Sequence, residues 1–240
     1  MVADADRMRE STIVALDVSA HEALEIARAL AGRARWLKVG MTLYYAEGPQ
    51  IVAKLREMGF EVFLDLKLHD IPHQVEGAAR ELARLGVGMF TVHAAGGRAM
   101  MEAAVRGACA GSDACGLDTP SVLAVTVLTS MDDVALAESG VHASPRDQVA
   151  RLAALGVHAG VQGIVCSPHE AAEVRTLVGP ERLVVTPGVR PRGSDAGDQA
   201  RVATPRDAFA AGATHIVIGR PVTAAQQPAA AFESIVTEEW

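Results

Sequence analysis

Charged residues interrupt one of the most apolar stretches of the sequence. Residues 63–72 read FLDLKLHDIP, so a segment that begins as an apolar strand carries Asp65, Lys67 and Asp70 in a DxKxxD pattern. Because side chains alternate between the two faces of a strand, Asp65 and Lys67 share one face with Phe63. An unpaired buried charge is costly, so these groups must pair with one another or take part in chemistry.

Lys38 lies in the neighbouring predicted strand and completes a cluster of two cations and two anions. One interpretation is a salt-bridge network that only neutralises itself. A pair about 4 Å apart, at an effective dielectric of about 20, gains about 4 kcal/mol before desolvation is counted. In the other interpretation, the network fixes the Lys67 ammonium beside a reacting carbon. There it would stabilise developing negative charge and then donate a proton.

A second set of candidate residues lies near the C-terminus. Residues 186–190 (TPGVR) end one apolar run, and residues 218–221 (IGRP) end the next and open a helix. Amides at a helix start, a glycine that permits close approach, and the guanidinium groups of Arg190 and Arg220 suit a phosphate dianion. The alternative for each arginine is an ordinary place on a surface turn.

Three further features could belong to the same site. Residues 192–199 (RGSDAGDQ) are rich in Gly, Asp and Ser, which favours a mobile lid over the phosphate or an ordinary connection. Asp17 could accept hydrogen bonds from a sugar hydroxyl, or cap the helix that begins near Ser19. His93 could line the site or pack beside it. We expect no second histidine near His93, so a metal role for it is not favoured.

Eight apolar runs alternate with segments of helical spacing, and they must position these residues. The predicted strands are 12–16, 36–39, 61–66, 88–92, 122–127, 163–166, 182–186 and 215–218, and the predicted helices are 21–30, 50–58, 75–85, 98–106, 146–155 and 168–177. This alternation predicts parallel strands closed into a (β/α)8 TIM barrel, whose chemistry lies at the C-terminal strand ends. An open doubly wound sheet is the alternative, although no Gly-rich dinucleotide fingerprint follows the first strand.

Composition narrows the class of protein. With 240 residues, half of them hydrophobic, and a mean hydropathy of +0.19, the chain can form one domain over 1–240, with 1–10 as an N-terminal extension. The net charge is −7 and the basic residues are scattered, which argues against nucleic-acid or membrane partners. The three cysteines form no CxxC pair, and no signal peptide or membrane span is evident. We therefore predict a cytoplasmic protein with reduced thiols.

Taken together, these motifs resemble the bacterial type of the orotidine 5′-monophosphate decarboxylase family. The similar segments follow the family's order along nearly the whole chain: ALD at 15–17, KVG at 38–40, FLDLKLHDIP at 63–72, TVHAAGG at 91–97, VTVLTSM at 125–131, TPGVRPRGSDAGDQ at 186–199 and VIGRPVT at 217–223. The DxKxxD pattern alone is shared with related phosphate-binding decarboxylases. Its combination with GSDAGDQ and IGRP is far more specific.

The resemblance implies removal of CO2 from orotidine 5′-monophosphate to give UMP, the last step of de novo pyrimidine nucleotide synthesis, without metal or organic cofactor. It implies that Lys67 donates the proton within a network of Lys38, Asp65 and Asp70. It further implies a homodimer in which Asp70 reaches the neighbouring subunit's site. The implied substrate-binding residues are Asp17, Lys38, Ile71, Thr129, Arg190, Gln199, Gly219 and Arg220.

Two departures from the family pattern stand near these residues. The chain reads His73-Gln74 where bacterial members commonly have Asn-Thr, and Ala200 follows Gln199 where arginine is common. Neither change touches the charged network, so we expect altered affinity rather than lost chemistry. Two other functions remain open at this point: a metal-dependent sugar-phosphate decarboxylase or epimerase on a similar barrel, and a non-catalytic barrel that binds a nucleotide phosphate.

Overall fold

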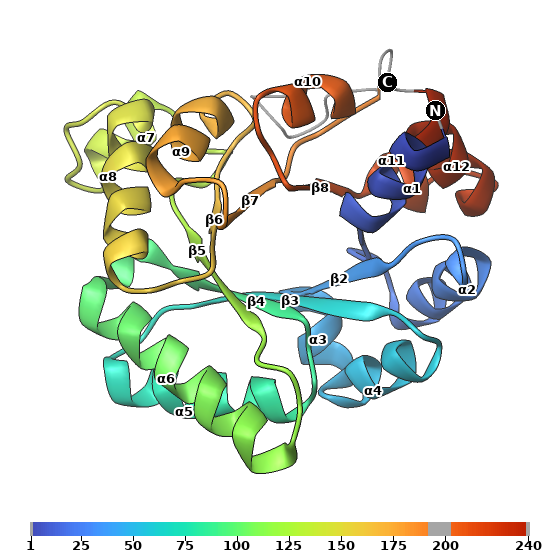
Figure 1. Cartoon of the computed structure of the whole chain (residues 1–240), viewed down its shortest axis with the longest axis horizontal. Coiled ribbons are helices and arrows are strands. Elements are labelled where there is room, and N and C mark those ends of the chain that lie inside the picture. Colours follow the sequence, from blue (N-terminus) through green and yellow to red (C-terminus); the bar gives the residue numbers. More distant parts are fainter. Residues whose placement is uncertain (1, 192–202, 239–240) are drawn as a thin grey trace.

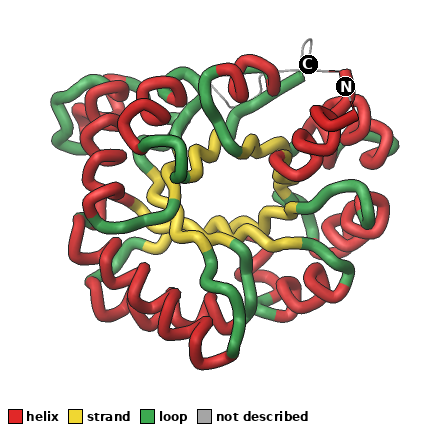
Figure 2. The backbone as a smooth tube through the Cα atoms, in the orientation of Figure 1, coloured by secondary structure: helices red, strands yellow, loops and turns green. Residues whose placement is uncertain are grey.

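The computed structural model describes residues 2–191 and 203–238, and the side chains of 5–191 and 203–237. Eight parallel strands close into a barrel in the order β1 to β8, with β1 paired to both β2 and β8. Figure 2 shows this ring of strands with helices around its outside. The predicted (β/α)8 TIM barrel is therefore confirmed. The predicted lid, residues 192–199, lies outside the described residues, and Gln199 with it.

The strands fall where the apolar runs predicted them, with ends that differ by at most two residues. They are β1 (Thr12–Ala15), β2 (Trp36–Gly40), β3 (Glu61–Leu68), β4 (Met89–His93), β5 (Ser121–Val125), β6 (Gly163–Val165), β7 (Leu183–Thr186) and β8 (His215–Ile218). Strand β3 is the longest, and its extra residues carry the charged pattern into the mouth of the barrel.

All six predicted helices are present, and others join them (Figure 1). The helices are α1 (Val2–Ser11), α2 (Ala20–Leu30), α3 (Met41–Glu47), α4 (Gln50–Glu57), α5 (Pro72–Arg84), α6 (Arg98–Cys115), α7 (Asp133–Glu138), α8 (Pro145–His158), α9 (Ala171–Val178), α10 (Pro205–Ala210), α11 (Arg220–Thr223) and α12 (Pro228–Glu238), with a 3-10 turn at Ala94–Gly96. Within the described ranges, no helix is long and apolar enough to cross a membrane.

Side-chain caps explain two short helices, α7 and α10, that hydrophobic spacing did not predict. Asp132 caps α7 by accepting a hydrogen bond from the Ala135 amide, and Thr204 caps α10 in the same way. Both helices are too short to show a clear apolar period. The expected N-terminal extension forms α1, where Met8 is buried and Arg9 pairs with Glu233 of α12 at 2.6 Å.

Hydrophobic residues fill two layers, one inside the barrel and one between strands and helices. Phe63 of β3 belongs to the inner cluster, whereas its neighbours Val62 and Leu64 pack in the outer layer. This alternation places the predicted inner face of β3 toward the barrel axis, as expected from the period of a strand. The inner cluster also contains Ile13, Ala15, Trp36, Met89, Leu123, Val185 and Val217.

Helix α6 continues well past residue 106, where the sequence predicted its end. Gly107 and Gly111 look like helix breakers in the sequence, but both face α5 at very short range. A Cβ atom at Gly107 would lie 2.2 Å from the Glu76 carbonyl oxygen, and one at Gly111 would lie 2.3 Å from that of Arg80. These glycines let the two helix backbones approach closely, so packing decides the length of α6.

This packing predicts opposite effects for two glycine-to-alanine substitutions. Gly107→Ala forces α5 and α6 apart and should lower the free energy of unfolding by about 1–3 kcal/mol. Gly77, in the interior of α5, has open space around its missing Cβ. Gly77→Ala should therefore raise the free energy of unfolding by about 0.5–1 kcal/mol. Denaturant unfolding at one protein concentration measures both, and a Gly107→Ala protein as stable as the parent would contradict the explanation.

Candidate active site

A cavity of about 470 Å³ opens where the strands end, within the size range of small-molecule sites. Its apolar floor includes Ala15, Phe63, Val185 and Val217 of the inner cluster. The polar side of its lining comes from residues that the sequence singled out: Asp17, Lys38, Asp65, Lys67, Thr129, Arg190, Gly219 and Arg220. The barrel thus brings most of the predicted site together.

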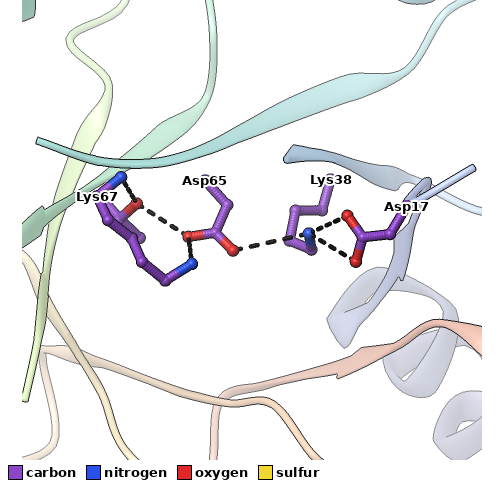
Figure 3. Close-up of polar contacts among 5 residues, drawn as sticks. Asp17, Lys38, Asp65 and Lys67 are labelled. Carbon is purple, nitrogen blue, oxygen red and sulfur yellow. Dashed lines mark hydrogen bonds and ion pairs between the residues drawn. The ribbon is translucent and has the colours of Figure 1, made fainter. Parts of the chain in front are cut away.

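Four charged side chains, one just after β1 and the others in β2 and β3, form a row at one side of the cavity (Figure 3). The ammonium of Lys38 lies 2.8 Å from the nearer oxygen of Asp17 and 3.6 Å from Oδ2 of Asp65. The ammonium of Lys67 lies 2.8 Å from Oδ1 of Asp65. Charges alternate along the row, so each inner charge has an opposite charge on either side.

Burial is greatest in the middle of this row. The side chains of Lys38 and Asp65 are 8% and 16% exposed, against 26% for Lys67 and 62% for Asp17. Burial alone would raise the pKa of Asp65. The positive charges of Lys38 and Lys67 and the hydrogen bonds from Lys67 and Thr91 outweigh it, so the pKa lies below its usual value. Asp65 is therefore a fixed negative charge between two cations.

The backbone of β3 departs from a regular strand at Lys67. This residue has φ +53°, which makes it the one non-glycine with positive φ among the described residues. The pairing with β4 shifts here, since Leu64 pairs with Phe90 but Leu68 pairs with Val92. The sequence correctly predicted the face of β3 from which Lys67 projects. It also predicted a regular strand at this residue, and that prediction was wrong. A bulge re-aims a side chain in this way.

Thr91 of β4 is a member of the site that sequence reasoning missed. It is fully buried, and its hydroxyl accepts a hydrogen bond from the Lys67 amide at 2.9 Å and donates one to Oδ1 of Asp65 at 3.0 Å. The available signal was a threonine on the inner face of an apolar strand, because a buried hydroxyl requires partners.

Gly40 keeps space for the outer end of the charged row. A Cβ atom there would lie 2.6 Å from Oδ1 of Asp17 and 3.2 Å from the Lys38 ammonium. The expected alternative role of Asp17 as a helix cap is wrong, because Ser19 itself caps α2 in a capping box with Glu22. The Asp17 carboxylate instead forms an ion pair with the Lys38 ammonium.

The predicted phosphate residues follow β7, which lies opposite β3 in the barrel, and β8, which is paired to β1 (Figure 1). Arg190 is buried, its amide donates to the Ala203 carbonyl at 2.9 Å, and its guanidinium donates to the Val189 carbonyl at 2.9 Å. Gly219 follows β8 and precedes Arg220, the first residue of α11. Arg190 and Arg220 therefore bring two guanidinium groups to the same cavity.

Asp70 and Ile71 are not among the residues that line the cavity of their own chain. Both belong to a run of exposed residues, 69–74, and Ile71 is 63% exposed. The carboxylate of Asp70 accepts a hydrogen bond from the Ile71 amide at 2.6 Å. A second cavity of about 360 Å³ adjoins the charged row and is lined by Asp17, Val18, Ser19, Lys38, Gly40, Met41, Thr42, Asp65 and Lys67.

His93 packs beside the site and does not line its cavity. Its ring lies 5.5 Å from that of His69, centroid to centroid, so the expectation that no second histidine is near was wrong. Burial lowers the pKa of His93, and the charges of His69 and Lys67 lower it further. Among the residues that the structure describes, no group of three or more His, Cys, Asp or Glu side chains could hold a metal ion.

Comparison with known proteins gives a consistent set of relatives. A family model described as "Orotidine 5'-phosphate decarboxylase / HUMPS family" matches residues 11–235. Orotidine 5′-phosphate decarboxylase of Anaeromyxobacter sp. (strain K) is 54% identical over 227 residues, covering 94% of this chain and 96% of that protein. The protein of the same name from Cutibacterium acnes is 49% identical over 230 residues, covering 95% of each.

Solved structures agree with these sequence relatives. The crystal structure of orotidine 5′-phosphate decarboxylase from Lactobacillus acidophilus is similar with a TM-score of 0.84 at 40% identity, covering 94% of this chain and 97% of that one. An uncharacterized conserved protein from Geobacillus kaustophilus matches with a TM-score of 0.83 at 43% identity, covering 95% of this chain and 99% of that one.

Proposed function

The chain belongs to the orotidine 5′-phosphate decarboxylase family, and on that premise we propose how its cavity converts orotidine 5′-monophosphate to UMP. This decarboxylation is a step of pyrimidine biosynthesis. The observation that carries the proposal is the Asp65–Lys67 pair, 2.8 Å apart and facing the cavity from the inner side of β3. It supplies a cation at a fixed place, next to a carboxylate that stays ionised.

The chemical difficulty of the reaction is the carbanion that forms at C6 of the pyrimidine. The bond between C6 and the carboxylate carbon breaks, CO2 leaves, and the electron pair stays on C6 with little resonance relief. In the proposed mechanism the Lys67 ammonium lies near C6, stabilises this charge as it develops and then transfers a proton to it. Solvent returns a proton to the amine. Carbon dioxide and UMP are the products, and no redox change occurs.

Asp65 has two proposed effects in this step. It holds the Lys67 ammonium in place, and its charge lies close to the position of the substrate carboxylate. Repulsion between the two carboxylates would disfavour the ground state and is relieved when CO2, which is neutral, departs. The support for this role is that Asp65 is mostly buried and has Lys38 and Lys67 on either side, so its charge cannot turn away into solvent.

The rest of the substrate would span the mouth of the barrel. Arg190, Gly219 and Arg220 would hold the phosphate, because two guanidinium groups and an approachable backbone suit a dianion. Arg190 follows β7, which lies across the ring from β3, whereas Gly219 and Arg220 follow β8, which is paired to β1. In the same proposal, Asp17 and Lys38 contact the ribose and Thr129 contacts the pyrimidine ring. Gln199 bridges the ring and the phosphate, and Ile71 lies near the substrate.

The proposed active unit is a homodimer in which Asp70 completes the network of the neighbouring subunit. The exposed run 69–74 supports this, since it sets an acid beside Ile71, a large apolar side chain. Met41 and Tyr45 of α3 are 47% and 76% exposed, and Met41 also lines the second cavity beside the charges. A partner's Asp70 entering there would give Lys67 a second carboxylate.

Replacing the lysine tests the chemical role. Lys67→Ala should lower turnover of orotidine 5′-monophosphate by at least about 10³-fold, since it removes both the charge and the proton donor. UMP affinity, measured by calorimetry, should stay within about tenfold because the phosphate contacts remain. Lys54→Ala is the matched control, as Lys54 is partly exposed on α4, pairs with Glu47 and does not line the cavity. Near-normal turnover by Lys67→Ala would remove Lys67 from the mechanism.

Mixed dimers test whether sites are shared. An Asp70→Ala chain paired with a Lys67→Ala chain would contain one intact site, with Lys67 from the first chain and Asp70 from the second. Purified mixed dimers should then recover about half the wild-type rate per dimer, while each variant homodimer stays inactive. If verified mixed dimers show no recovery, Asp70 acts in its own subunit. An active Asp70→Ala homodimer would show that Asp70 is not needed.

A further inference from the structure

Thr91 of β4 contacts two parts of the site, the backbone of Lys67 and the carboxylate of Asp65. Its hydroxyl accepts from the Lys67 backbone amide at 2.9 Å and donates to Oδ1 of Asp65 at 3.0 Å. Oδ1 of Asp65 is also the oxygen that the Lys67 ammonium contacts at 2.8 Å. The hydroxyl therefore touches the catalytic lysine at its backbone and the lysine's counter-charge at its carboxylate.

The Lys67 amide needs this partner because the strand is irregular there. Between two pairs of the β3–β4 ladder, the chain advances by four positions in β3, from Leu64 to Leu68, but by only two positions in β4, from Phe90 to Val92. A regular ladder cannot satisfy every amide across such a shift. A buried amide without a partner is unfavourable, and the Thr91 hydroxyl supplies the missing acceptor.

The same contact supports an unusual backbone conformation. Lys67 has φ +53°, in the left-handed region that a residue with a side chain adopts only when its surroundings impose it. Thr91 can impose it because its own position is constrained by packing and strand pairing. It is fully buried in β4, it pairs with Leu123 of β5, and its branched side chain has few accessible rotamers.

We propose that Thr91 is a positioning residue for decarboxylation, whose hydroxyl holds the Lys67 backbone in the conformation that aims its ammonium into the cavity. The inference rests on the proposed role of Lys67. Thr91 does not touch the substrate in this scheme, as it is absent from the lining of the cavity. It acts through the two groups that do line it, Asp65 and Lys67.

Two substitutions separate the hydroxyl from the bulk of the side chain. Thr91→Val keeps the shape and removes both hydrogen bonds, and Thr91→Ser keeps the hydroxyl and loses a methyl group. Thr91→Val should lower kcat by about 10- to 100-fold, because a small misplacement of a catalytic group has effects of that size. KM should change by less than about threefold, and Thr91→Ser should keep kcat within about threefold of wild type.

Thr126→Val is the matched control for loss of a buried hydrogen bond. The Thr126 hydroxyl donates to the Val165 carbonyl at 2.9 Å, and its side chain is buried like that of Thr91. The structure gives it no contact with Lys67 or Asp65. Its kcat should stay within about threefold of wild type, which would show that a lost buried hydroxyl alone does not slow the reaction.

Amide hydrogen exchange gives a readout that does not depend on activity. Exchange at the Lys67 amide should be faster in Thr91→Val than in wild type or Thr91→Ser, because its acceptor is gone. If Thr91→Val does not fold, Thr91→Cys replaces it, since a thiol has similar size and is a weak hydrogen-bonding group. An unchanged kcat and unchanged Lys67 exchange in the folded variant would overturn the proposal, as would a Thr91→Ser enzyme as slow as Thr91→Val.

Failure of the proposed function would look different. If Lys67→Ala turned over normally, the mechanism would fall, while the exchange rate would still report whether Thr91 holds the Lys67 backbone. If Lys67→Ala were inactive and Thr91→Val fully active, the mechanism would stand and only the positioning role would be lost.

Discussion

The alternating row Asp17–Lys38–Asp65–Lys67 is the interaction on which the active site depends. Lys38 and Asp65 are nearly buried, and neither charge would be tolerated there without the other. With a cation on either side, the pKa of Asp65 lies below its usual value despite burial. The row therefore holds the charged neighbours of Lys67 in place before any substrate arrives. Such preorganised charge is what a reaction through an unstabilised carbanion requires, because solvent would have to reorganise to provide the same effect.

The barrel makes this row possible by bringing three consecutive strand ends together. Asp17 follows β1, Lys38 lies in β2, and Asp65 and Lys67 lie in β3, so residues far apart in the chain meet at one edge of the ring. Closure of the barrel pairs β8 with β1, so that Arg190 after β7 and Arg220 after β8 line the same cavity as the row. In the proposed function, phosphate contacts at these residues would contribute binding energy to the organisation of the reacting centre. Gly40 contributes by its lack of a side chain, which leaves room for Asp17 beside Lys38.

Much of this arrangement could be predicted from the sequence, because strand period and strand-end position depend on local pattern. The eight apolar runs became the eight strands, and eight predicted site residues line one cavity. The features that could not be predicted depend on pairing between strands or helices. The bulge at Lys67 and the role of Thr91 follow from the register of β3 against β4, and the full length of α6 follows from its contact with α5. The proximity of His69 to His93 is likewise a product of the fold. The roles of Asp70 and Ile71 stay predictions, since they concern a second subunit, and Gln199 lies outside the described residues.

In the proposed mechanism, fixed charges of the protein, without a metal ion, lower the barrier to CO2 release. Turnover of orotidine 5′-monophosphate by the purified protein, dialysed against a chelator and assayed with the chelator in excess, tests it most directly. If the charged row supplies the stabilisation, CO2 and UMP appear at the rate measured without chelator. Activity that disappears with chelator and returns with an added divalent metal would contradict the claim. UMP binding without any CO2 release would contradict it as well, and would leave a binding protein in place of an enzyme.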